Sequence, residues 1–173
     1  MSDFFQKVTG AQDMFKSLAS KIPGFGGYVE RQNRRAADKL LRETVAKRYE
    51  QLYSRASALQ VDLVNSGMIA YVDDMEKGVI KIRTFIDKIS RAAYGASGLF
   101  DAVKINEKEL EQIYQFDNAF FDLGDQTARA LDTVEASLAD EQALPAAIRN
   151  LTQLARQAVD TFDRRTEVIT GSK

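Results

Sequence analysis

The side chains best suited to chemistry are carboxylates gathered between residues 107 and 125. Six lie there: Glu107, Glu109, Glu111, Asp117, Asp122 and Asp125. Carboxylates in a helical bundle can hold iron or manganese, but such centres combine them with histidines at Glu-x-x-His spacing. The chain has no histidine, and the three aspartates mostly flank the apolar stripe of their predicted helix. The pattern therefore predicts no metal centre.

Other catalytic classes also lack their residues. Without histidine or cysteine, the chain has neither the commonest general base nor a thiol nucleophile nor the usual zinc ligands. It contains no Gly-rich phosphate loop and no dinucleotide fingerprint. We therefore expect a protein that is not an enzyme and that takes no cofactor.

The first 22 residues carry a different pattern, that of an amphipathic helix. At 100° per residue, one half of this helix is apolar and the lysines lie near or beyond its edges, as in helices at a membrane interface. We expect the apolar residues to insert into a membrane or a protein partner: Phe4, Phe5, Val8, Met14, Phe15, Leu18 and Ile22. Lys7, Lys16 and Lys21 are expected to contact acidic head groups or carboxylates.

Energetics predict that this helix forms only against something apolar. The burial of its large side chains, about 1.5–3 kcal/mol each, nearly cancels the cost of ordering the backbone, about 1–2 kcal/mol per residue. The apolar surface can be a lipid interface, a partner or sister subunit, or the chain's own bundle, and the sequence leaves these three open. The segment 23–27 is predicted to be a hinge, through Pro23, Gly24, Gly26 and Gly27.

Four long helices are predicted beyond the hinge, in a domain spanning residues 28–170. They run from about 28 to 64 and from 68 to 94, and then begin near 106 and 145. The first has apolar residues at helical spacing, namely Ala37, Leu41, Val45, Tyr49, Leu52, Ala56, Leu59 and Leu63. The second has a coiled-coil-like seam from Val72 to Ala93. The fold class expected is all-α, an antiparallel four-helix bundle with an N-terminal amphipathic helix.

Charge is distributed unevenly along these helices. Residues 28–66 carry eight basic and five acidic side chains, whereas residues 101–141 carry three basic and eleven acidic ones. A basic ridge is predicted from Arg31, Arg34, Arg35, Lys39 and Arg42. This ridge can be a solvated face of the bundle. It can also determine which helices are neighbours, or guide association between molecules. Nucleic acid is not expected, since the net charge is −1 and an acidic helix repels phosphates.

Aromatic residues cluster in the helix that begins near 106, at Tyr114, Phe116, Phe120 and Phe121. Gly78 and Gly124 lie inside predicted helices, where glycine costs about 1 kcal/mol relative to alanine. Such glycines let a second helix or a ring approach closely, so core packing is the first interpretation. A ligand cavity or a second interaction face is the alternative.

The order of these segments resembles that of phage shock protein A and its membrane-remodelling relatives: an amphipathic helix, a Pro/Gly hinge and long charged helices. The segment 22–28, with Arg34 to Glu43 after it, is also similar to bacterial helical-bundle proteins of unassigned function. The resemblance implies a bacterial protein that acts at a membrane surface. A cytoplasmic location, peripheral at the membrane, is compatible with the absence of cysteine and of any long apolar run.

The function expected is that of a structural or adaptor protein whose N-terminal helix docks on a membrane surface or a protein partner. A protein partner or self-association is expected, without metal or nucleic acid. The alternatives are a self-assembling shell or filament subunit and a small-molecule-binding helical bundle.

Overall fold

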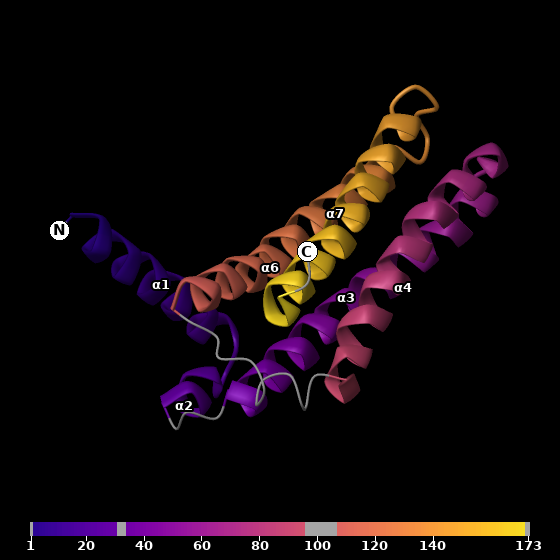
Figure 1. Cartoon of the computed structure of the whole chain (residues 1–173). Helices are drawn as coiled ribbons and strands as arrows, with labels where there is room; N and C mark the ends of the chain where they lie inside the picture. The colour runs from indigo at the N-terminus through magenta and orange to yellow at the C-terminus, as the bar shows by residue number, and fades with distance from the viewer. Residues whose placement is uncertain (1, 31–33, 96–106, 172–173) are drawn as a thin grey trace. The chain divides into compact units, whose positions relative to one another are not determined.

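Every element of the structure, a computed structural model, is helical. The structure describes residues 2–30, 34–95 and 107–171, with side chains over 12–30, 35–91 and 108–171. Figure 1 shows the helices in chain order: α1 (Ser2–Lys21), α2 (Phe25–Glu30), α3 (Arg34–Asn65), the 3-10 helix η1 (Ile69–Tyr71), α4 (Val72–Gly95), α6 (Glu107–Ala136) and α7 (Leu144–Thr170). The prediction of an all-α protein is confirmed. Over the described residues, none of these helices has the length and apolar content needed to cross a membrane.

The predicted hinge differs from the structure. Pro23 and Gly24 form a turn, and Gly24 has a φ of 86°, in the left-handed region that favours glycine. Gly26 and Gly27, expected in the hinge, instead lie in α2. Glycine is a weak helix former, but Phe25 is buried and its packing outweighs that local preference. The helix predicted from about residue 28 corresponds to the end of α2 and to α3, and residues 31–33 between them lie outside the described residues.

The chain divides into two compact units, to which all four long helices contribute. Unit 1 comprises Met1–Val45, Ile89–Phe121 and Thr161–Lys173, and unit 2 comprises Ala46–Lys88 and Asp122–Asp160.

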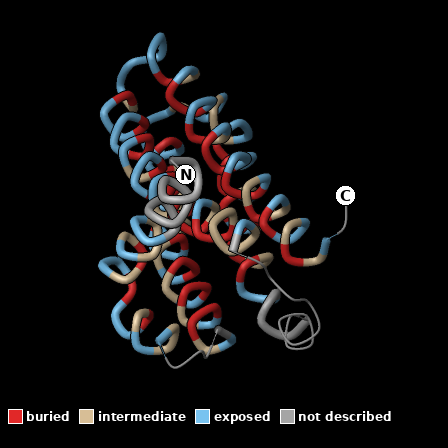
Figure 2. Tube along the Cα trace, turned by 60° about the vertical axis from the view of Figure 1, so that its left-hand side comes forward, coloured by how far each residue is buried: buried red, intermediate tan, exposed pale blue. Residues whose placement is uncertain are grey.

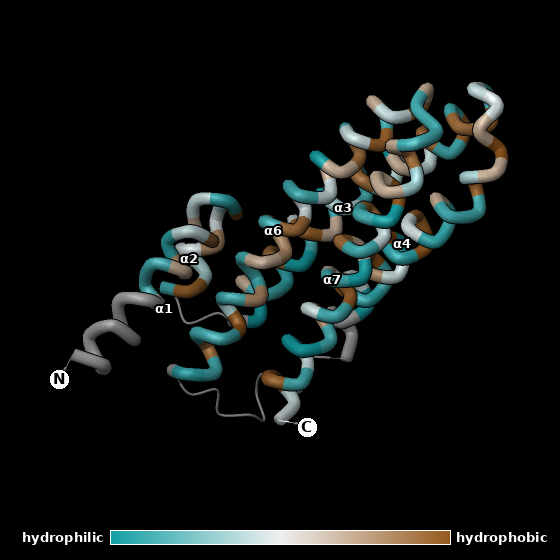
Figure 3. Tube along the Cα trace, turned by 90° about the horizontal axis from the view of Figure 1, so that it is seen from above, coloured by the Kyte–Doolittle hydropathy of each residue, from teal (hydrophilic) through white to brown (hydrophobic). Residues whose placement is uncertain are grey.

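Helical periodicity predicted the core of α3 correctly, because all eight stripe residues from Ala37 to Leu63 are buried. Figure 2 shows buried positions recurring at intervals along the helices, and Figure 3 shows apolar positions recurring along them in the same way. In α6 the pattern departs from the prediction, because Phe116 is half-buried while Asp117 and Asn118 are buried. Asp117 bonds to α7 and Asn118 to α1, so α6 has neighbours on two sides and buries adjacent positions.

In unit 2, side chains identify which helices are neighbours. The rings of Tyr49 on α3 and Phe85 on α4 are 4.3 Å apart. Arg48 and Arg55 on α3 pair with acidic residues of α6, Arg48 with Asp125 at 3.6 Å. The opposite charges predicted for these two segments therefore meet across the α3–α6 contact. Gly78 and Gly124 also lie at helix contacts, Gly78 against α7 and Gly124 against the Tyr49 ring.

Candidate functional site

The second half of α1, residues 12–21, packs within unit 1. Leu18 and Ile22 have no exposed surface, Met14 and Phe15 are half-buried, and Lys16 and Lys21 are exposed. Leu18 and Ile22 were expected to insert into a membrane or partner. In this position of α1 they are already covered by the chain itself, because the turn at residues 22–24 brings α1 back against its own unit.

The remaining residues of the predicted insertion face lie in the first half of α1. Phe4, Phe5, Lys7 and Val8 belong to the helix, but their side chains lie outside the described ones. Of the predicted face, the structure therefore describes the side chains of residues 14–22, and residues 4–8 are known only as part of the helix.

Three aromatic rings join α1 and α2 to α6. The ring of Phe15 lies 5.9 Å from that of Phe25 and 6.2 Å from that of Tyr114, and the last two are 6.3 Å apart. These separations are within the range of favourable aromatic contacts. We call this group the aromatic clasp. The sequence indicated an aromatic cluster on α6 but not that Tyr114 would meet rings from the N-terminal segment.

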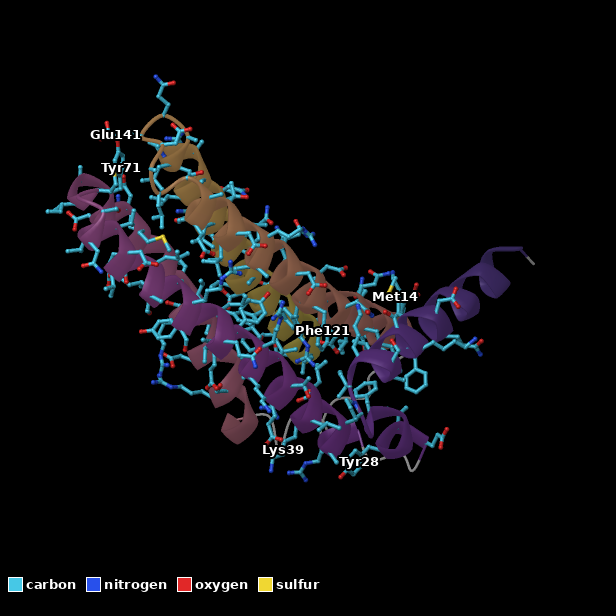
Figure 4. All side chains as sticks on the ribbon, turned by 180° about the vertical axis from the view of Figure 1, so that it is seen from behind. Met14, Tyr28, Lys39, Tyr71, Phe121 and Glu141 are labelled. Carbon is cyan, nitrogen blue, oxygen red and sulfur yellow. The ribbon has the colours of Figure 1, made fainter. Side chains whose placement is uncertain are left out.

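A buried amide also holds α1. The side-chain N–H₂ of Asn118 donates to the backbone carbonyls of Met14, at 3.1 Å, and of Tyr114, at 3.0 Å. The Lys21 ammonium donates to the Asn118 amide oxygen at 3.5 Å and lies 5.5 Å from the centre of the Phe121 ring. Figure 4 labels Met14 and Phe121 in this region. Sequence reasoning missed Asn118, and the only signal was its polarity amid apolar neighbours.

Four charged side chains form a buried network in the same unit. Arg42 donates to Asp38 at 2.7 Å, and Arg165 donates from Nε to Asp117 at 2.6 Å and from a second nitrogen to Asp38. All four are buried, and they come from α3, α6 and α7. Two acids and two bases balance, so each charge has a partner that offsets its removal from water.

This network corrects two expectations. Arg42 was predicted to belong to a basic ridge, for which a solvated face was one interpretation, and Asp117 to flank the apolar stripe. Both are buried, and each pairs with an opposite charge. Of the other ridge residues, Arg35 and Lys39 are exposed, Lys39 with Glu43 at 3.8 Å. Arg31 and the side chain of Arg34 lie outside the described residues. Arg42, the last residue of the predicted ridge, is therefore not on the surface.

The two acids respond differently to burial. Burial works to raise the pKa of Asp38, but Arg165 and Arg42 outweigh it and hold that pKa below its ordinary value. For Asp117 burial prevails over the attraction of Arg165 and raises the pKa to about 6. The difference follows from the number of partners, since Asp38 bonds to two arginines and Asp117 to one.

A small cavity lies beside the network, lined by residues that include Phe25, Val29, Tyr114, Asp117 and Arg165. Its volume is about 30 Å³, enough for about two water molecules. Among the described residues, no buried side-chain nitrogen or oxygen lacks a hydrogen-bond partner. Nor do the described residues contain a group of three metal-binding side chains.

Comparisons with known proteins found no similar protein from which a function could be proposed. The chain matches no protein-family model, no curated protein and no solved structure.

Proposed function

We propose that this protein is a non-enzymatic helical scaffold that docks on a membrane surface through the first half of α1. The docking residues are Phe4, Phe5 and Val8, with Lys7 beside them. The body that carries this helix is an antiparallel four-helix bundle of α3, α4, α6 and α7.

The helix contacts within each unit support the bundle. In unit 2, α3 adjoins α4 through Tyr49 and Phe85, and it adjoins α6 through Arg48 and its acidic partner. There α4 also adjoins α7, at Gly78. In unit 1, α6 adjoins α7 through the Asp117–Arg165 pair. Each long helix thus has at least two of the others as neighbours, and the short connections 66–71 and 137–143 favour antiparallel pairs.

One observation carries the membrane proposal: in the sequence, the apolar pattern of α1 continues beyond residues 14–22, the part of the face whose side chains the structure describes. Ile22 and Leu18 give the direction of this face, since both are fully buried. Phe4 precedes Ile22 by 18 residues, about five turns at 3.6 residues per turn, so the helical period assigns both positions to one face of the sequence pattern. About 27 Å of helix separates them at 1.5 Å per residue. Phe5 and Val8 extend the face around Phe4.

The chemistry of this end suits a lipid interface. Burial of Phe4, Phe5 and Val8 contributes about 1.5–3 kcal/mol per side chain before ordering costs. A lysine near an anionic surface contributes about 1 kcal/mol, and Lys7 and the exposed Lys16 are in α1. These magnitudes predict reversible, peripheral binding that strengthens with the anionic lipid content.

Vesicle flotation tests the proposal with two matched double variants. Phe4→Glu/Phe5→Glu places two acids on the proposed face, and Val61→Glu/Val64→Glu places two at exposed apolar positions of α3. With equimolar phosphatidylcholine and phosphatidylglycerol vesicles, the wild type and the α3 variant are expected to float and the α1 variant to remain in solution. Equal flotation of the two variants would refute the proposal.

Light scattering without lipid tests the competing function, self-assembly through α1. A wild-type protein that assembles but does not float, and that becomes monomeric with Phe4→Glu/Phe5→Glu, would replace membrane docking with self-assembly through the same residues.

A further inference from the structure

The covered half of α1 competes with the proposed membrane contact. Leu18 and Ile22 are buried within unit 1, yet they share the helix face of Phe4 and Val8. A helix lying in a lipid interface buries one continuous apolar face, so full engagement needs all of these residues at once. We infer that the packing of α1 on α2 and α6 is an autoinhibitory contact, released when α1 leaves both helices and presents its whole face to lipid. The inference rests on the proposed function and concerns the regulation of the same face.

The contact is specific in its position. Asn118 bonds at once to the Met14 carbonyl and to the Tyr114 carbonyl of its own helix, so the amide fixes where α1 lies along α6. The aromatic clasp adds a second fixed point, because Phe15 meets Tyr114 directly and also meets Phe25 on α2. A sliding or rotated α1 would lose both sets of contacts together. The docked position of α1 is therefore discrete, because α1 keeps both sets of contacts or loses both.

The contact is also limited enough to open. Within the described part of α1, Leu18 is the only fully covered large side chain before Ile22 at its end, while Met14 and Phe15 retain exposed surface. Release leaves no polar group without a partner, since water can bond to the Asn118 amide and the Met14 carbonyl. The apolar side chains uncovered on α1 then move into the lipid, which offsets their exposure. Vesicles are therefore able to shift the balance that the docked contacts set.

Loosening the contact at Asn118 is the first test. Asn118→Ala removes the bond to the Met14 carbonyl without altering any residue of the α1 face. The net loss of one or two hydrogen bonds shifts such an equilibrium by about three- to tenfold, so this variant is expected to bind the same equimolar vesicles more tightly by that factor. Thr127→Val is the matched control, because Thr127 is equally buried on α6 but bonds only to the Leu123 carbonyl of its own helix.

Locking the contact is the second test. A Cβ built on Gly26 lies 3.9 Å from the Ala19 Cβ, within the span of a disulfide, and the natural chain has no cysteine. In Ala19→Cys/Gly26→Cys, the oxidised protein holds α1 against α2 and is expected to bind vesicles several-fold more weakly than the same protein after reduction. Equal binding of the two redox forms would overturn the inference.

The two proposals fail in different ways. If Phe4→Glu/Phe5→Glu leaves flotation unchanged, membrane docking through α1 is wrong. If that variant abolishes flotation while Asn118→Ala matches the wild type and the disulfide has no effect, the docking stands and the autoinhibitory contact is wrong. An equal gain in Asn118→Ala and Thr127→Val would also overturn the inference, since general loosening would then explain the binding.

Discussion

The stability of this protein should fall as pH rises through the range in which Asp117 loses its proton. Burial raises the pKa of this carboxyl from 3.8 to about 6. Between these values the folded protein holds a proton that the unfolded chain has lost. Folding is therefore favoured at the acid end, and the advantage disappears as pH approaches about 6. A shift of about two pKa units corresponds to about 3 kcal/mol, as an order of magnitude.

Asp38 acts with the opposite sign but in a different range. Its pKa lies below 3.8 in the folded protein, so its stabilising contribution is complete above that value and is lost only as pH falls through the lower, folded pKa. The interval from about pH 4 to about pH 6 therefore isolates Asp117 from its neighbour in the network.

Asp117→Asn tests this reasoning, because the amide keeps the shape of the side chain but does not titrate. Urea unfolding followed by circular dichroism, at several pH values between about 4 and 6, gives the free energy of unfolding of each protein. Relative to Asp117→Asn, the wild type is expected to lose up to about 3 kcal/mol over this range. Asp132→Asn removes an exposed acid of the same helix and controls for the change in net charge. Parallel curves for the wild type and Asp117→Asn would refute the assignment.

Three further predictions concern packing, the turn and the network, each measured by urea unfolding. Gly78→Ala should be about 1 kcal/mol less stable than Gly124→Ala. The methyl added at Gly78 lies 3.0 Å from an α7 hydroxyl, whereas the methyl added at Gly124 lies 3.5 Å from a ring. Equal stabilities of the two variants would contradict the close contact at Gly78. Gly24→Ala should cost about 1–2 kcal/mol, because φ is 86° there, and an unchanged midpoint would argue against the turn. Asp38→Ala should cost about 3–5 kcal/mol by leaving buried arginine charge unbalanced, whereas Lys39→Ala, in an exposed pair, should cost under about 1 kcal/mol.

The regular part of the fold could be predicted from the sequence because it depends on spacing alone. The stripe of α3 is fully buried, from Ala37 to Leu63, since residues three and four apart share a face whatever they pack against. The starts of α6 and α7 were likewise close to their predicted positions near residues 106 and 145.

The candidate site was harder to predict because it depends on partners far apart in sequence. Arg165 is buried only because Asp38 and Asp117, from two other helices, lie beside it, and spacing within one helix carries no information on such a meeting. The helix at Phe25–Glu30 was missed for a similar reason: its glycines oppose helix formation, and the packing of Phe25 on α1 and α6 is tertiary.

The Asp38–Arg42–Asp117–Arg165 network has a consequence for how the chain finds its fold. Long amphipathic helices can associate in several orders and registers with similar apolar burial. A slip of α7 by one turn, about 5.4 Å, would carry the Arg165 guanidinium away from both carboxylates and leave ions of each sign in a dry interior. Buried ion pairs add little to net stability, but an orphaned buried charge costs about 3–5 kcal/mol. The network thus selects against misaligned assemblies of α3, α6 and α7, and its main contribution is to the uniqueness of the folded state.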